Sequence, residues 1–359
     1  MNSATPPFWP YTAAEITPAW LSAVLEARYP GVDVATVEVA YRAEVTNSHA
    51  RIRMTYHSAA GAPETMFCKL PPTDERRQAI LATRMGQREA QFYARLASSI
   101  EMRIPVAHAA LTDDDQNFVI LLEDLSVTDC KISDGTWGID ADAAAGVIDD
   151  LAALHARFED PARRKAEAPW VIKHRVNRDY GPGLLRYGLT NHRDRLSDEF
   201  ATIAELYISH PDEMQELWRQ GPTTIIHGDT HIGNLFIEGN RVGFLDWGII
   251  NVNSALRELG YFLTMSMDID ARRGAEVDLI RHYLDRRRAN GAAEVSFDEA
   301  WRCYRQQAAY NVLASAQVVT FPENATPARK VFANAFLARA EASIADLDTV
   351  SALRDVGLG

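Results

Sequence analysis

Strand-like patterns lie mainly in the first third of this 359-residue chain, and helical patterns fill most of the rest. Apolar and polar residues alternate over 50–56, the period of a half-buried strand. Four segments are expected to be strands: 37–45, 50–56, 64–70 and 117–122. This segregation predicts an α+β protein with a small sheet lobe, a larger helical lobe and a boundary near residues 123–135.

Two early helices are also expected. The first covers 15–29, with Thr17 as its N-cap and Pro18 at the first helical position. The second stretch ends near Leu96. From about residue 140 onward the patterns are helical except for one hairpin. In the first long helix of that region an apolar stripe is formed by Val147, Ile148, Leu151, Leu154 and Phe158. We interpret the neighbouring His155 as structural.

Charge and cysteine content exclude several classes of protein. The chain has 37 Lys+Arg against 49 Asp+Glu, a net charge of −12, which disfavours nucleic acid and anionic membranes as partners. No apolar run reaches the roughly 18 residues of a membrane span, and the N-terminus has no signal-peptide pattern. The three cysteines, Cys68, Cys130 and Cys303, are far apart. We therefore expect a cytoplasmic protein with free thiols.

One hairpin brings polar residues together. Leu235–Glu238 and Arg241–Leu245 read as strands, and Gly239-Asn240 is a two-residue turn signal. In that register Asn234 faces Leu245, and Asp246 lies one residue beyond. Asp229 lies five residues before Asn234. The pattern predicts that Asn234 and Asp246 meet at the open end of the hairpin, with Asp229 on the loop that feeds it.

Two carboxylates and an amide oxygen form a hard set of ligands, of the kind that Mg²⁺ prefers. The alternative is a hairpin with ordinary polar ends, since Asp and Asn are common in turns. His227 and His231 could instead be a zinc pair, but that spacing places both on one face only in a helix. Gly228 and Gly233 argue against a helix, so we interpret both histidines as structural loop residues.

The same stretch carries a family resemblance. Residues 227–234 (HGDTHIGN) resemble the HGDxHxxN signature of the aminoglycoside phosphotransferase and choline kinase-like superfamily, whose members share the protein-kinase fold. Residues 245–248 (LDWG) resemble its metal-binding segment, and 257–262 (RELGYF) its following helix, with Glu258 in place of the usual Asp. The resemblance implies a small antiparallel-sheet nucleotide lobe over 1–125 and a helical catalytic and substrate-binding lobe over 126–359.

The resemblance extends to the first lobe. Residues 67–70 (FCKL) resemble the strand that carries the nucleotide lysine, here Lys69. Glu89 lies inside the apolar stripe of the next helix, where a carboxylate needs a counter-charge. Lys69 is the natural partner, as in the family's lysine–glutamate pair. Residues 119–125 resemble the hinge that reads adenine through its backbone, which implicates Glu123 and Leu125.

One departure concerns the phosphates. Kinase-like folds often cover them with a glycine-rich loop, but residues 41–51 contain no glycine. Thr46, Asn47 and Ser48 offer polar donors there instead.

The resemblance implies an enzyme that uses ATP and Mg²⁺ to phosphorylate a hydroxyl of a small molecule. Lys69 would hold the nucleotide phosphates, Glu89 would orient Lys69, Asn234 and Asp246 would hold the metal, and Asp229 would accept the hydroxyl proton. The length and the early helix resemble the ecdysteroid-kinase-like branch. The acceptor pocket is expected in the helical lobe after residue 140, especially in its last helices, over about 274–346. Two alternatives remain open: a nucleotide-binding pseudokinase without turnover and a metal-dependent hydrolase.

Overall fold

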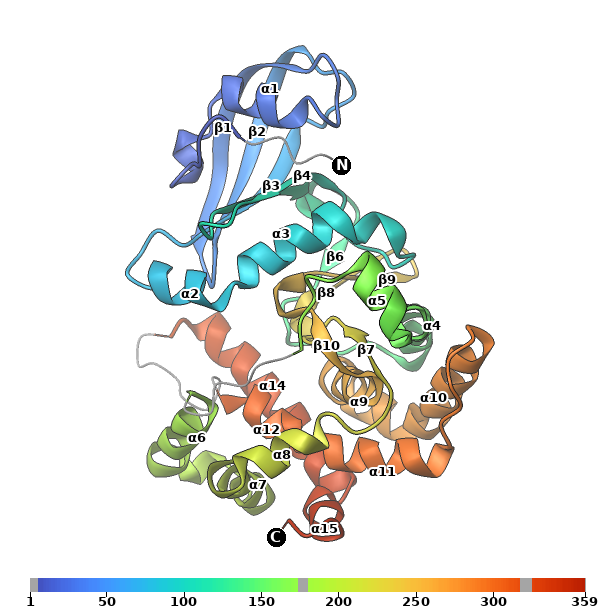
Figure 1. Ribbon diagram of the computed structural model, residues 1–359. Helices are drawn as coiled ribbons and strands as arrows, with labels where there is room; N and C mark the ends of the chain where they lie inside the picture. The colour runs from blue at the N-terminus through green and yellow to red at the C-terminus, as the bar shows by residue number, and fades with distance from the viewer. Residues whose placement is uncertain (1–5, 174–179, 317–324, 359) are drawn as a thin grey trace. The chain divides into compact units, whose positions relative to one another are not determined.

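The computed structural model describes residues 6–173, 180–316 and 325–358. The chain divides into two compact units (Figure 1). The first comprises 1–132, 236–239 and 243–250, and the second comprises 133–235, 240–242 and 251–359. Residues 317–324, which fall inside the expected acceptor region, lie outside the described residues.

The first unit is built on a five-stranded antiparallel sheet of order β1-β2-β3-β5-β4. Its elements are α1 (Pro18–Leu25), β1 (Asp33–Glu44), β2 (Ser48–Ser58), β3 (Thr65–Leu70), α2 (Arg77–Thr83), α3 (Met85–Arg95), β4 (Ala107–Thr112), β5 (Phe118–Glu123) and β6 (Lys131–Ile132). The first helix is shorter than predicted, but Thr17 does cap it, by accepting a hydrogen bond from the backbone N–H of Trp20. β4 was not predicted, because an alanine-rich segment has no strand signature of its own and becomes a strand by pairing with β5.

Strand alternation gives the sheet two different faces. Ile52 and Met66 are fully buried with Trp20 and Leu21 of α1 in one hydrophobic core. Lys69 lies on β3 between Cys68 and Leu70, both of which belong to that core, so Lys69 points to the opposite face. The first unit thus uses α1 to cover one face of its sheet and keeps the lysine on the other.

The second unit is mainly helical. Its elements are α4 (Ala141–Glu159), α5 (Pro161–Glu167), α6 (Tyr180–Asn191), α7 (Asp198–Ser209), α8 (Pro211–Leu217), β7 (Thr223–Ile226), β10 (Asn251–Ser254), α9 (Ala255–Ser266), α10 (Ile269–Ala289), α11 (Phe297–Gln307), α12 (Tyr310–Ala314), α14 (Pro327–Asp346) and α15 (Thr349–Arg354). The hairpin of β8 (Leu235–Glu238) and β9 (Arg241–Phe244) pairs beside β6 and contributes residues to both units.

The prediction of a single hairpin after residue 140 was wrong. β7 and β10 form a second antiparallel pair, with Asn251 opposite Ile226. Each strand has four residues, too few to show a period, and paired residues lie 25 to 31 positions apart in the sequence. This ribbon matters because the 227–234 segment leaves one of its strands and α9 follows the other.

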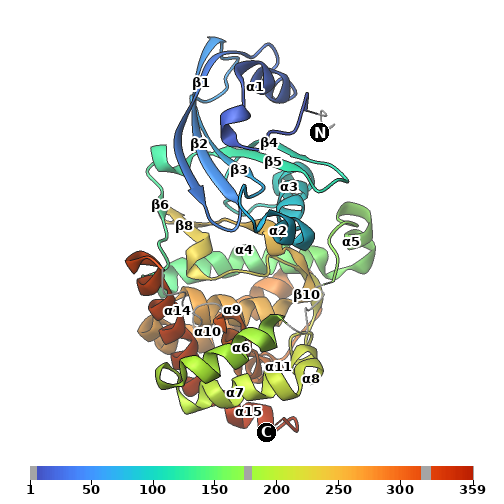
Figure 2. The ribbon, with the colours of Figure 1, turned by 90° about the vertical axis from the view of Figure 1, so that its left-hand side faces the viewer.

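Helix α9 is the centre of the second unit, since all of its twelve residues are buried. It begins at the N-cap Ser254 and lies alongside α4 and α10 (Figure 2). The predicted apolar stripe of α4 is confirmed as buried: Val147, Ile148, Leu151, Leu154 and Phe158. Because α9 is held on every side, the side chains that it projects toward the 227–234 segment are fixed in position.

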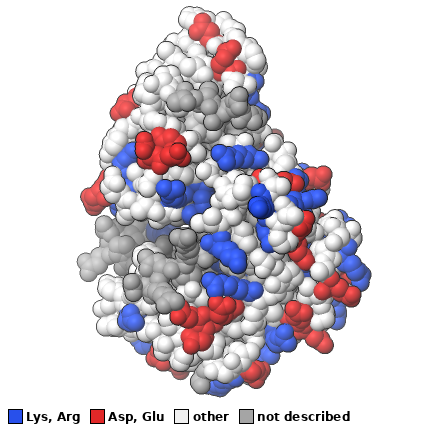
Figure 3. Space-filling view, viewed as in Figure 1, with Lys and Arg blue, Asp and Glu red and all other residues white. Residues whose placement is uncertain are grey.

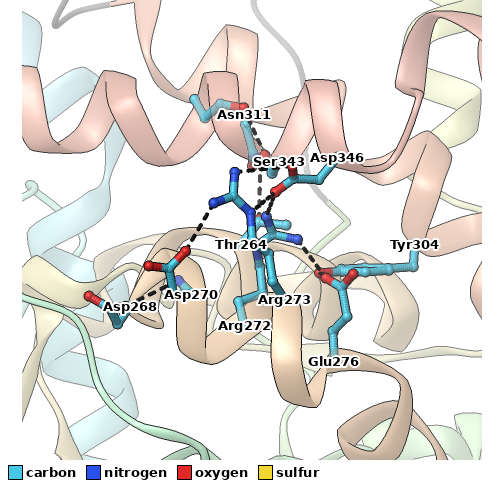
Figure 4. Close-up of polar contacts among 11 residues, drawn as sticks. Thr264, Asp268, Asp270, Arg272, Arg273, Glu276, Tyr304, Asn311, Ser343 and Asp346 are labelled. Carbon is cyan, nitrogen blue, oxygen red and sulfur yellow. Dashed lines mark hydrogen bonds and ion pairs between the residues drawn. The ribbon is translucent and has the colours of Figure 1, made fainter.

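Buried polar contacts tie the later helices together (Figure 4). Arg272 of α10 is almost fully buried and pairs with Glu276 at 2.6 Å and with Asp346 of α14. Tyr304 of α11 donates to Glu276 at 2.7 Å, and Asn311 of α12 bridges α9 and α14. A buried guanidinium needs such partners to offset its lost hydration, so the network fixes how these helices pack.

None of the helices in the described ranges is long and apolar enough to cross a membrane. Acidic and basic side chains are both spread over the face seen in Figure 3, although acidic residues predominate in the sequence.

Candidate active site

In the first unit, Lys69 and Glu89 form the ion pair predicted from the sequence. The Lys69 Nζ atom lies 2.7 Å from Oε1 of Glu89, and both side chains are buried. Burial alone would lower the pKa of Lys69, but the charges of Asp246 and Glu89 outweigh it and raise that pKa. Lys69 is therefore a fixed ammonium at neutral pH, available to a polyanionic ligand.

Asp246 lies beside this pair. Its Oδ1 is 4.0 Å from the Lys69 ammonium, and its side chain is 41% exposed. Its backbone is in the left-handed region, at φ 58° and ψ 71°, which costs a non-glycine residue roughly 1–2 kcal/mol. Such strain persists only where the surroundings impose it.

Helix α3 supplies those surroundings. The indole of Trp247 stacks on Phe92 with ring centroids 3.9 Å apart, and Arg88 Nε donates to the backbone O of Gly248 at 2.9 Å. Arg88, Glu89 and Phe92 thus hold the Asp246 segment and Lys69 from one helix. The first unit presents one ammonium and one partly exposed carboxylate in a fixed arrangement.

In the second unit, Asp229 and Asn234 are brought together. Asn234 Nδ2 donates to Oδ2 of Asp229 at 3.0 Å and to its backbone O at 2.9 Å. Tyr261 of α9 donates from its hydroxyl to Oδ1 at 3.3 Å. Both carboxylate oxygens are therefore oriented, while the Asp229 side chain remains 25% exposed. A carboxylate held this way can receive a proton from a hydroxyl placed against its exposed side.

Glu258 braces the loop that carries Asp229. Its carboxylate accepts from the backbone N–H of His227 at 3.0 Å and of Gly228 at 2.6 Å, and contacts Nε2 of His155 at 2.9 Å. Burial alone would raise the pKa of Glu258, but the His155 hydrogen bond, the nearby His227 and the Gly228 N–H outweigh it and lower that pKa. The Glu in place of the family's Asp thus still reaches the loop.

The two loop histidines make local contacts. His227 Nδ1 accepts from the backbone N–H of Asp229 at 3.2 Å, and His231 Nδ1 accepts from that of Gly233 at 3.0 Å. Within the described residues, no group of three or more His, Cys, Asp or Glu side chains is arranged to hold a metal ion. These contacts agree with the interpretation of both histidines as loop residues, as do the two hydrogen bonds of the buried His155.

The remaining predicted residues lie in the first unit. Thr46 is exposed, whereas Asn47 and Ser48 are buried where β2 begins. Glu123 is engaged by Arg103, whose Nη2 lies 2.9 Å from its Oε1, and its backbone N–H donates to Val106. Leu125 follows at the start of a short 3₁₀ turn.

Sequence reasoning missed two side chains that lie near the predicted ones. His49 stands opposite Lys69 in the β2–β3 register, and burial, followed by the charge of Lys69, lowers its pKa to about 3. A neutral histidine therefore lies beside the lysine. Tyr261 of α9 was also missed. Neither could be found from local patterns, because one depends on strand register and the other on a contact across 32 residues.

Comparisons with known proteins bear on the family and the fold. The family model of the phosphotransferase enzyme family (APH) matches residues 47–294, more than half of the chain. No curated protein sequence matches the chain.

Solved structures show the fold. The GDP complex of aminoglycoside 2'-phosphotransferase-IIIa is 13% identical, with a TM-score of 0.52 over 92% of this chain and 99% of that one. A putative aminoglycoside phosphotransferase from Ralstonia eutropha is 12% identical, with a TM-score of 0.50 over 90% and 97%. The choline kinase LicA from Streptococcus pneumoniae is 10% identical, with a TM-score of 0.49 over 91% and 98%.

These findings confirm the predicted kinase-like α+β fold and the resemblance to the aminoglycoside phosphotransferase family. The chain belongs to the phosphotransferase enzyme family.

Proposed function

We propose that this protein is a kinase that transfers the γ-phosphate of ATP to a hydroxyl of a small molecule. The observation that carries the proposal is the buried Lys69–Glu89 pair, with the partly exposed carboxylate of Asp246 4.0 Å from the lysine. Burying an ammonium beside two carboxylates costs desolvation free energy. Proteins keep such arrangements mainly where a function requires them. Phosphoryl transfer has such a requirement, since it depends on fixed charges around the phosphates.

The roles follow from each residue's chemistry. Lys69 neutralises the nucleotide phosphates, and Glu89 keeps Lys69 in place. The polar residues Thr46, Asn47 and Ser48 approach the phosphates, and the backbone at Glu123 and Leu125 contacts the base. All of these residues fall within 1–125, which we propose as the nucleotide-binding lobe.

Asn234 and Asp246 are the proposed Mg²⁺ ligands. The donor set fits this ion, because Asp246 offers a carboxylate and Asn234 offers a carbonyl oxygen, its Nδ2 being engaged by Asp229. When bound, the metal supplies charge neutralisation at the phosphates.

Asp229 is the proposed catalytic base. Its carboxylate takes the proton of the acceptor hydroxyl as the hydroxyl oxygen forms a bond to the γ-phosphorus. The bond from that phosphorus to the β–γ bridging oxygen breaks, and ADP leaves with the electron pair. The hydrogen bonds from Tyr261 and Asn234 keep both carboxylate oxygens in position throughout.

Calorimetric titration with ATP and with GTP, with and without Mg²⁺, tests the nucleotide site. GTP is included because the first structural neighbour was solved with GDP. We expect Asp246→Ala to abolish the Mg²⁺-dependent part of nucleotide binding, while Asp129→Ala, at an exposed acid of the same unit, leaves it unchanged. Nucleotide affinity that is indifferent to both Mg²⁺ and Asp246→Ala would contradict the assignment. Binding without turnover of any alcohol would leave a nucleotide-binding pseudokinase as the function.

A second variant tests the ion pair. Glu89→Gln removes the charge that anchors Lys69 without changing side-chain size. We expect kcat/KM to fall at least about tenfold, or about 1.4 kcal/mol, through a higher KM for the nucleotide. Glu75→Gln, at an exposed position of the same unit, is the control. Equal kinetics for the two variants would show that Glu89 does not position Lys69.

A further inference from the structure

Asp229 lies against a group of aromatic side chains in the second unit. We call this group the aromatic wall and define it as His231, Tyr261, Tyr310, Phe332 and Phe336, which come from the 227–234 segment, α9, α12 and α14. Ring centroids are 5.1 Å apart for His231 and Phe336, 5.6 Å for Phe332 and Phe336, and 5.1 Å for Tyr261 and Tyr310. Two of its members touch Asp229: Tyr261 by a hydrogen bond and His231 at 3.6 Å.

Part of the wall is accessible. Asp229, His231, Tyr310 and Phe332 are all partly exposed, whereas Tyr261 and Phe336 are buried behind them. A β-carbon on Gly135 would fall 2.1 Å from the Phe332 ring, so this glycine leaves the space that the ring fills. The accessible residues around the proposed base therefore offer apolar ring surface to an acceptor.

Two of these rings already carry a cation from the protein itself. The guanidinium carbon of Arg257 lies 4.2 Å from the centroid of Tyr310, and that of Arg329 lies 5.2 Å from the centroid of Phe332. An aromatic face attracts a ligand's ammonium group through its quadrupole. Here the protein's own arginines already make this interaction, so a ligand cation at either ring would be repelled by a like charge.

Arg257 is unusual among the buried charges. It is 2% exposed, and its Nε and Nη1 atoms have no hydrogen-bond partner within the described residues. Its guanidinium lies over the rings of Tyr310 and Trp218. A buried charge without a carboxylate is expensive to keep, and an unsatisfied buried group of this kind requires an explanation. One explanation is that Arg257 places a positive charge behind the aromatic wall.

We infer that the acceptor is an uncharged alcohol with an apolar, ring-sized body, and that the site discriminates against polyamines and quaternary ammonium alcohols. The inference rests on the proposed function for the identity of Asp229 as the base. The acceptor's apolar body packs on Phe332 and Tyr310, its hydroxyl reaches Asp229, and Arg257 acts through Tyr310 as a specificity-determining residue.

Ligand-observed NMR on the full chain tests this without requiring turnover. Choline and 3,3-dimethylbutan-1-ol have the same shape and hydroxyl and differ in charge alone, and 2-cyclohexylethanol adds a ring. We expect both neutral alcohols to bind at least about tenfold more tightly than choline. Choline binding as tightly as its neutral isostere, or no binding by either neutral alcohol, would overturn the inference.

Substitutions of single rings test whether the neutral alcohol binds at the aromatic wall. Phe332→Ala should weaken 2-cyclohexylethanol binding about tenfold. The matched control is Phe297→Ala, because Phe297 also lies partly buried in the second unit under an arginine, Arg281 at 4.8 Å. If Phe332→Ala does not fold, Phe332→Leu removes the ring and keeps most of the apolar volume. Equal affinities in the Phe332 and Phe297 variants would refute the wall as the binding surface.

Arg257→Met tests the charge itself. The variant should bring choline affinity to within about threefold of its neutral isostere, and an unchanged ratio would refute the role of Arg257. Failure of the proposed function would appear elsewhere, as an absence of Mg²⁺-dependent nucleotide binding, so the two failures are distinguishable.

Discussion

Asp229→Asn should lower kcat about 10²–10⁴-fold, the usual contribution of a positioned general base. The amide keeps the shape of the carboxylate but cannot take the hydroxyl proton. Nucleotide binding should change little, because the proposed phosphate and base contacts come from the first unit. Single-turnover kinetics with saturating Mg²⁺-nucleotide would measure the chemical step directly.

Tyr261→Phe provides a graded comparison. It removes the single hydrogen bond to Oδ1 of Asp229 and leaves the carboxylate in place, so its loss of kcat should be smaller, about tenfold. Asp194→Asn, at an exposed acid of the second unit, is the control. A kcat for Asp229→Asn within a factor of about three of wild type would rule out Asp229 as the base.

Glu258→Ala should destabilise the protein strongly. Glu258 is 2% exposed and engages two backbone N–H groups and His155. Each buried group left without a partner costs about 1–3 kcal/mol, so the three together predict a loss of roughly 3–9 kcal/mol. Urea unfolding would measure this loss, and Glu294→Ala, at an exposed position, should stay within about 0.5 kcal/mol of wild type. A loss below about 1 kcal/mol would contradict the bracing role.

The same carboxylate predicts a pH dependence. Its pKa is lowered in the folded state from an ordinary value of 4.5. Its contribution to stability is therefore present above about pH 4.5 and is lost as the pH falls through the folded-state pKa. Wild type should lose stability faster than Glu258→Gln on acidification, as melting temperatures measured from pH 7 to pH 3 would show. Parallel curves for the two proteins would indicate that Glu258 does not titrate in this way.

Glu258 also shows what a sequence motif can convey. The motif placed an acidic residue on the helix after residues 245–248, and the longer Glu left its role open. The structure shows that the Glu reaches two successive N–H groups, a distance that depends on where α9 packs against the β7–β10 ribbon. That ribbon was not predicted, because four-residue strands carry no readable period.

The Lys69–Glu89 pair was predictable because each partner contradicts its local pattern: a lysine on a core-flanking strand and a carboxylate in an apolar stripe. Burying either charge alone is prohibitive, so the two positions imply each other. The division into a strand-rich and a helix-rich part was also predictable, because strands and helices repeat their apolar residues at different spacings along the sequence.

Tertiary structure alone decided the surroundings of Asp229. Arg257 and Tyr261 belong to the 257–262 motif, but the motif does not indicate that their side chains lie near Asp229. Tyr310 and Phe332 lie 81 and 103 residues after Asp229, and nothing in their spacing relates them to it. They meet there because burial of apolar surface brings distant segments together. The hydrophobic effect is non-directional, so it leaves no pattern in the local sequence. The sequence therefore determined the fold class and the family motif, whereas the proposed choice of acceptor depends on contacts that exist only in the folded chain.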